Sequence, residues 1–62
     1  MEPLSPGQRV FWRTEDDELL EGVVVAVALV PYRQGFTPGF LARVGDGLRW
    51  GREPQIVRGH DL

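Results

Sequence analysis

The sequence predicts a small all-β domain in which five short strands form a partly open barrel. Gly and Pro, 8 and 5 in number, recur at close intervals, as they do where short strands alternate with turns. The runs between them are rich in Val, Phe and Trp, which favour strands. Residues 45–47 (GDG) lie between two apolar runs and are typical of a tight hairpin turn, because such a turn needs positive φ angles.

Composition limits both the size of the core and the class of protein. The 62 residues are expected to form one domain, and a chain of this length buries only about 60% of its unfolded surface. Without cysteine there are no disulfides or thiolate metal sites, so dense packing or self-association must stabilise the fold. A net charge of −2 provides no basic field for nucleic acid or for an anionic membrane.

The first half of the chain contains two strands and two loops. Residues 1–7 are an irregular lead-in, and residues 8–13 (QRVFWR) are the first strand. An acidic loop at 14–18 (TEDDE) precedes the long apolar segment 19–30 (LLEGVVVAVALV). Residues 31–39 (PYRQGFTPG) are expected to be a loop, because Gly and Pro recur in them.

The second half contains three shorter strands. Residues 40–44 (FLARV) and 48–50 (LRW) pair across the 45–47 turn. After a short break, residues 55–58 (QIVR) form the last strand, and residues 59–62 (GHDL) close the chain.

A helix is the alternative structure for residues 19–30. Thr14 would cap its N-terminus, and the acidic residues after it would complement the helix dipole. Against the helix stand Gly22 in its interior and four valines between positions 23 and 27, since valine is stiff at χ1 and prefers strands. We therefore predict a strand.

The two faces of that strand differ in size. Odd positions from 23 to 29 carry bulky side chains, and even positions from 22 to 28 carry mostly small ones. Either both faces meet core inside a small barrel, or the small-residue face at Val24, Ala26 and Ala28 packs against another subunit. We expect the core to contain Val10, Trp12, Val23, Val25, Val27, Leu29, Phe40, Ala42, Val44, Leu48 and Ile56.

Four segments resemble the Tudor/KOW-type members of the Src-homology-3-like small barrels. They are residues 6–12 (PGQRVFW), 21–27 (EGVVVAV), 40–47 (FLARVGDG) and 60–62 (HDL). The resemblance covers about residues 6–62 and implies a five-stranded barrel that acts as a binding module. Ligands of that family range over peptides, modified residues and RNA, so the resemblance does not identify the partner.

A narrower resemblance is to the plasmid-borne type II dihydrofolate reductases, small barrels that work as tetramers around a pore. Residues 7–10 (GQRV), 37–42 (TPGFLA) and 54–57 (PQIV) are similar to that family's Gly-Asp-Arg-Val, Thr-Pro-Glu-Gly-Tyr-Ala and Val-Gln-Ile-Tyr. Only Gln55 and Ile56 match the pore motif, and the chain has no lysine to line a pore. We expect a shared architecture without the reductase activity, and no cofactor.

The densest charge cluster is Glu15, Asp16, Asp17 and Glu18. It is a solvated loop, a contact for a basic partner, or a metal site, but it lacks the alternating spacing and the glycine of a calcium loop. We expect a solvated loop and no metal. The single histidine, His60, stands beside Asp61. A catalytic dyad would need a nucleophile or a bound metal, and a lone histidine cannot provide a metal shell, so His60 is expected to cap a turn at the chain end.

Aromatic residues are the candidate binding residues, because six of them exceed what so small a core needs. Tyr32 and Phe36 lie in the predicted loop, Phe11 alternates outward between two arginines, and Arg43 would orient an acidic or carbonyl group. In the alternative, the loop folds over the barrel end and buries its aromatics. The predicted binding residues are Phe11, Tyr32, Phe36, Arg43 and Trp50.

These observations predict a non-enzymatic module that binds a protein or peptide, with self-association to a homo-oligomer as one form of that binding. The alternative is an RNA or single-strand-binding module, since residues 31–62 carry an excess of +2 charge and aromatic rings that can stack on bases. A small oligomeric enzyme of the reductase type is a third class. The longest apolar run, 23–30, is too short for a membrane helix of about 20 residues, so we expect a cytoplasmic protein without a membrane partner.

Overall fold

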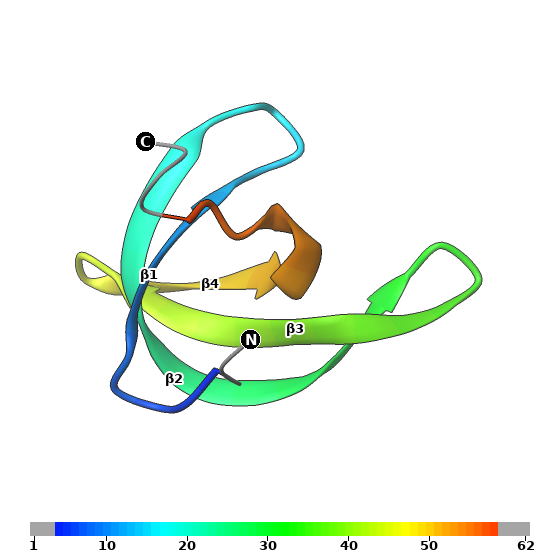
Figure 1. Cartoon of the computed structure of the whole chain (residues 1–62), viewed down its shortest axis with the longest axis horizontal. Coiled ribbons are helices and arrows are strands. Elements are labelled where there is room, and N and C mark those ends of the chain that lie inside the picture. Colours follow the sequence, from blue (N-terminus) through cyan, green and yellow to red (C-terminus); the bar gives the residue numbers. More distant parts are fainter. Residues whose placement is uncertain (1–3, 59–62) are drawn as a thin grey trace.

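The computed structural model describes residues 4–58, which form four strands and one short 3₁₀ helix. The elements are β1 (Arg9–Arg13), β2 (Leu19–Tyr32), β3 (Gly35–Val44), β4 (Gly47–Arg52) and η1 (Glu53–Gln55). The strands form one antiparallel sheet in the order β1-β2-β3-β4, which curls but does not close (Figure 1). The prediction of an all-β fold is confirmed.

The C-terminal part of the described chain differs from the prediction of a fifth strand at 55–58. Residues 53–55 form η1, and the chain beyond η1 pairs with β1 through a single bridge between Trp12 and Ile56. The Val57 N–H also donates to the Phe11 carbonyl, at 2.8 Å. Pro54 lies within η1, where a proline suits the first turn but cannot donate to a strand ladder. The predicted turn-capping residue His60 lies outside the described residues.

The segment 19–30 is a strand, as predicted, and β2 continues to Tyr32. The predicted loop at 31–39 is wrong. The chain reverses over only Arg33 and Gln34, with Arg33 at φ +58°, and β3 begins at Gly35.

β2 continues past β1, and from Leu29 to Pro38 the β2–β3 hairpin also projects beyond β4 as two strands; we call residues 25–38 the arm (Figure 1). β1 pairs with β2 only over residues 19–23, and β4 pairs with β3 only from Gly39 onward. Pro31 and Pro38 therefore lie where both strands are at an edge, which is where a strand tolerates proline. The prolines that indicated a loop are edge-strand prolines.

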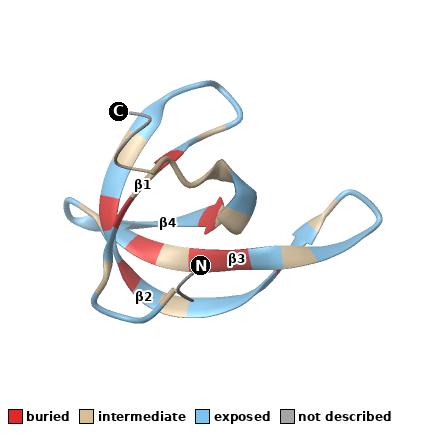
Figure 2. Ribbon diagram, in the orientation of Figure 1, coloured by how far each residue is buried: buried red, intermediate tan, exposed pale blue. Residues whose placement is uncertain are grey.

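The buried residues come from all four strands of the curled sheet (Figure 2). Trp12 and Phe40 are fully buried and meet edge to face, with ring centroids 5.0 Å apart and planes at 90°. The predicted core positions Val44 and Ile56 are only half-buried and pack against this cluster. Among the described residues the buried apolar side chains are Val10, Trp12, Val24, Val30, Phe40 and Ala42.

Five predicted core residues are exposed, and that part of the prediction is wrong. Their exposed fractions range from 40% for Val23 to 66% for Leu29. Of the three small-residue positions of β2, only Val24 is buried within the chain, at 2% exposure, so it cannot contact another subunit. Ala26 is half-buried and Ala28 is exposed. The exposed residues are Val23, Val25, Val27, Leu29 and Leu48.

Close approach of the neighbouring strand explains why the inward positions are small. A Cβ added to Gly22 would lie 2.6 Å from the Arg43 carbonyl oxygen, so a side chain there would displace β3. A β-bulge between Val24 and Ala26 then shifts the alternation by one residue. Val27 is consequently opposite Phe40, on the core face, but it lies on the arm and the fold does not cover it.

The hairpin turn predicted at 45–47 is confirmed. β3 ends at Val44, β4 begins at Gly47, and Gly45 has φ +59°. On β4, Gly51 is buried, and a Cβ there would collide with the Phe40 ring and lie 2.9 Å from Trp12 Nε1. The described residues contain no helix of the length and apolarity needed to cross a bilayer.

Candidate binding site

A hollow with a cavity volume of about 450 Å³ opens where the acidic loop, the end of β2, β4 and η1 meet. We call it the Tyr32 pocket. Its apolar lining comes from Trp12, Val30, Pro31, Tyr32 and Trp50. Its polar lining includes Glu15, Arg49, Arg52 and Gln55.

Strand alternation and register explain how Trp50, Arg52 and Tyr32 come to lie on the same side of the sheet. Trp50 and Arg52 are two residues apart on β4 and so lie on one face, and β3 places Gly39 directly opposite Arg52. Gly39 has no side chain, and a Cβ there would lie 2.7 Å from Val30 Cγ2. The missing side chain leaves room for Val30 beside β4, and Tyr32 comes two residues later on the same face of β2.

Arg52 links the three segments that surround the pocket. Its guanidinium carbon lies 4.0 Å from the centroid of the Tyr32 ring, and its Nη2 is 3.3 Å from Glu15 Oε1. Its backbone N–H donates to Gln55 Oε1 at 2.9 Å. The Arg52 side chain is only 20% exposed, but Glu15 is 75% exposed, so solvent screens their ion pair much as it screens a surface pair.

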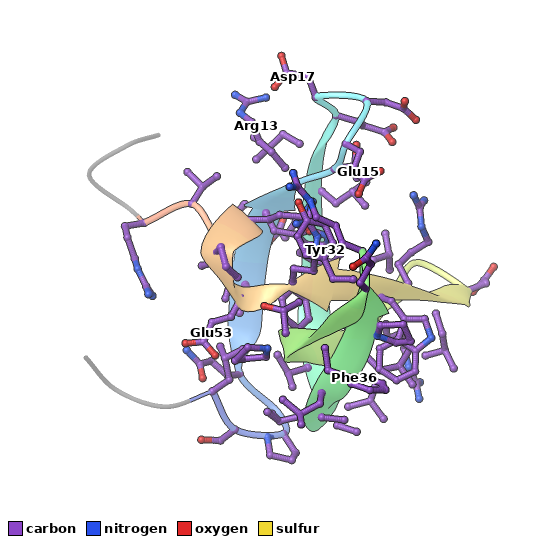
Figure 3. The ribbon with its side chains drawn as sticks, turned by 90° about the vertical axis from the view of Figure 1, so that its right-hand side faces the viewer. Arg13, Glu15, Asp17, Tyr32, Phe36 and Glu53 are labelled. Atoms are coloured by element: carbon purple, nitrogen blue, oxygen red, sulfur yellow. The ribbon has the colours of Figure 1, made fainter. Side chains whose placement is uncertain are left out.

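The acidic loop is closed by its own hydrogen bonds, which determine where Glu15 lies. The Thr14 N–H donates to the Glu18 carbonyl at 2.9 Å, and the Glu18 N–H donates to Thr14 Oγ1 at 3.1 Å. Asp17 has φ +64°, and Arg13 Nη1 lies 3.7 Å from its Oδ1. Figure 3 shows Glu15 on the Tyr32 side of this loop and Asp17 at its far end.

Two guanidinium groups act on the Tyr32 phenol. Hydrogen bonding to Arg33 first, and to Arg52 second, holds the pKa of Tyr32 below its ordinary value of 10.0. The Arg33 guanidinium carbon lies 5.1 Å from the ring centroid, on the turn that ends the arm. Tyr32 therefore presents an aromatic face and a polarised hydroxyl at the pocket.

Trp12 contributes a donor without an acceptor. Its Nε1 is buried and has no hydrogen-bond partner among the described residues. An unpaired buried donor costs about 1–3 kcal/mol. The perpendicular Phe40 ring is the aromatic neighbour of this indole, and a Cβ added to Gly51 would lie 2.9 Å from Nε1.

The structure brings together only two of the five predicted binding residues. Tyr32 and Trp50 both line the Tyr32 pocket, and Trp50 is 59% exposed. Phe36 lies on the arm with 72% of its surface exposed, away from Glu15 and Tyr32 (Figure 3). Phe11 is half-buried on β1, and Arg43 lines a separate hollow at the β3–β4 turn.

Sequence reasoning missed Arg52, Arg49 and Glu15 as members of one site. Tyr32 and Arg52 are far apart in the chain, and neither their spacing nor the composition between them predicts that they are in contact. One signal was available: Trp50 and Arg52 are two residues apart, so a longer β4 places them on one face. Within residues 4–58 no group of three or more His, Asp or Glu side chains is placed to hold a metal ion.

Compared with known proteins, the chain matches no family model, no curated protein and no solved structure. Its function must therefore be inferred from the chemistry of the site.

Proposed function

We propose that the chain is a small binding module whose Tyr32 pocket takes a peptide segment of a protein partner. The observation that carries this proposal is the convergence of Tyr32, Trp50 and two arginines around one apolar hollow. Aromatic and arginine side chains dominate the binding energy of small interfaces. A concave, mostly apolar surface with a few polar groups is also the usual form of a ligand site.

The lining favours an apolar side chain next to an acidic group. Tyr32 and Trp50 offer rigid aromatic surfaces that lose little conformational entropy on binding. Arg52 already pairs with Glu15, whereas no ion pair of Arg49 is found among the described residues. Arg49 is exposed and is therefore the arginine that can pair with a carboxylate of the ligand.

A peptide suits this site better than a nucleic acid does. Glu15 stands at the pocket, and the rest of the acidic loop comes directly after it, so a phosphate backbone would meet repulsion there. A peptide carries its charge only at particular side chains and avoids that cost. The module is proposed to act by binding, without a catalytic step or a bound cofactor.

The same proposal includes the Src-homology-3-like barrel as the architecture. The Trp12–Ile56 bridge and the Val57–Phe11 hydrogen bond support it, because they place the chain after η1 against β1, the strand at one edge of the sheet. A fifth strand that partly closes a barrel would run there.

Selection from a random peptide library on the immobilised chain tests the proposal. We expect enriched peptides with an apolar residue next to Asp or Glu, and we expect Trp50→Ala to abolish the enrichment. Calorimetric titration with one enriched peptide and with oligothymidylate then separates the two ligand classes. Binding of oligothymidylate alone, weakening steeply with salt, would replace the peptide proposal by the nucleic-acid one.

A further inference from the structure

One face of the arm is apolar throughout and uncovered. Residues directly opposite each other in an antiparallel pair share a face, and here Leu29 is opposite Pro38 and Pro31 is opposite Phe36. Leu29 and Phe36 are 66% and 72% exposed, the largest exposed fractions among the large apolar residues of the described chain. We call this surface the arm face: Val27, Leu29, Pro31, Phe36 and Pro38.

We propose that two copies of this chain associate through the arm face. The surface carries no charged or polar side chain, although the chain has 9 acidic and 7 basic residues. An uncharged apolar patch is complementary to itself, because neither copy buries a charge that the other must pair. In a two-fold dimer the same patch meets itself, and this requirement selects self-complementary surfaces.

The arm also lacks support within one chain. A two-stranded ribbon by itself is marginally stable in water. Within the described residues, the contacts that attach the arm to the rest of the fold lie on its other face, where Val30 is buried and Tyr32 stacks with Arg52. A second copy would supply the missing layer over the arm face.

The small size of the core also favours self-association. Six apolar side chains are buried in the described chain, whereas eight large ones are exposed. Self-association is one of the few ways in which a short chain without disulfides gains buried apolar area.

A dimer would need only a modest share of the surface of the chain. A standard interface buries about 800 Å² per partner, which is roughly one sixth of the 4573 Å² that the chain exposes. The arm face would form the centre of the contact. A neighbouring hollow toward η1 is lined by Pro38, Pro54 and Ile56 and by the charged residues Glu53 and Arg58, so it would form a mixed rim of the contact.

Sedimentation equilibrium of the complete chain tests the proposal. We expect a mass of twice 7.0 kDa at high micromolar concentration. Leu29→Lys and Phe36→Glu should each raise the dissociation constant by about 100-fold or more, because each would bury an unpaired charge in the contact. Both positions are exposed in the monomer, so near-ultraviolet circular dichroism should show an intact core.

Leu48→Lys is the matched control, since Leu48 is 55% exposed but lies beside the β3–β4 turn. It should dimerise as the unchanged chain does. The proposal is overturned if the unchanged chain stays at 7.0 kDa, if both charged arm variants still dimerise, or if Leu48→Lys dissociates the dimer equally well. Trp50 lines the Tyr32 pocket from β4, outside the arm. Trp50→Ala should therefore leave the dimer intact, which keeps this test independent of peptide binding in the Tyr32 pocket.

Discussion

The Arg52 guanidinium stacks on the Tyr32 ring, with its central carbon 4.0 Å from the ring centroid. The contact joins the arm to β4, and through Glu15 it also joins both to the acidic loop. The side chains that line the Tyr32 pocket thus also hold its walls in place. Pre-arranged walls reduce the entropy lost when a ligand binds.

Titration of Tyr32 should report this contact directly. Tyr32 is the only tyrosine, so its phenolate absorbance is unambiguous. We expect a pKa below 10.0, and we expect Arg33→Gln and Arg52→Gln each to raise it, because each removes a cation that stabilises the phenolate. Arg49→Gln is the control and should leave the pKa unchanged. An ordinary pKa in the unchanged chain would contradict the contact.

The same shift gives a pH dependence of stability with a definite sign. The folded state releases the Tyr32 proton at a lower pH than the unfolded chain does. Between the lowered pKa and about 10, the unfolded state binds more protons, so the free energy of unfolding should rise with pH in that window. Urea unfolding across the window, compared with Tyr32→Phe, measures the difference. The prediction would be contradicted if the free energy of unfolding fell with pH in the unchanged chain but not in Tyr32→Phe.

Peptide affinity should depend on the two aromatic walls of the Tyr32 pocket. Tyr32→Ala and Trp50→Ala should each weaken binding of a selected peptide by about 1–3 kcal/mol, since aromatic anchors carry most of the energy of small interfaces. Arg43→Ala is the control, because Arg43 lies in the separate hollow at the β3–β4 turn. Calorimetry gives the affinity and thermal unfolding gives the melting temperature of the same variants. Lower melting temperatures with normal affinity would assign the two aromatic residues to the fold instead.

Gly51 should tolerate no side chain. Gly51→Ala would push a methyl group into the Phe40 ring and toward Trp12 Nε1, and overpacking of this kind costs about 1–3 kcal/mol. Gly47→Ala on the same strand is the control, because its Cβ would meet only the Val44 carbonyl oxygen at 3.9 Å. Denaturant unfolding compares the two variants, and equal stabilities would mean that the Trp12–Phe40 pair is packed differently.

The inward face of β2 can be tested with adjacent valines. Val24→Ala should cost about 2 kcal/mol, because Val24 is 2% exposed and its removal leaves a cavity. Val25→Ala should change the free energy of unfolding much less, since Val25 is 42% exposed. If Val25→Ala destabilised the chain more than Val24→Ala does, the bulky face of β2 would be the core face.

Local patterns in the sequence are enough to predict the all-β class, the position of β1, most of β2 and the β3–β4 turn. β-branched runs and a Gly-Asp-Gly turn act through the conformational preferences of neighbouring residues, so no tertiary information is needed. Val10, Trp12, Phe40 and Ala42 were predicted as core for the same reason, because simple alternation places them on one face of their strands.

Tertiary structure alone decided which face of β2 is buried, how far the arm extends and which residues line the Tyr32 pocket. The inward face depends on how closely β3 approaches Gly22 and on a bulge that shifts the alternation, and neither is visible in local sequence. The arm depends on where β1 and β4 stop pairing, so its prolines resembled loop signals. The contact between Tyr32 and Arg52 exists only because the register of three strands brings together residues far apart in the chain.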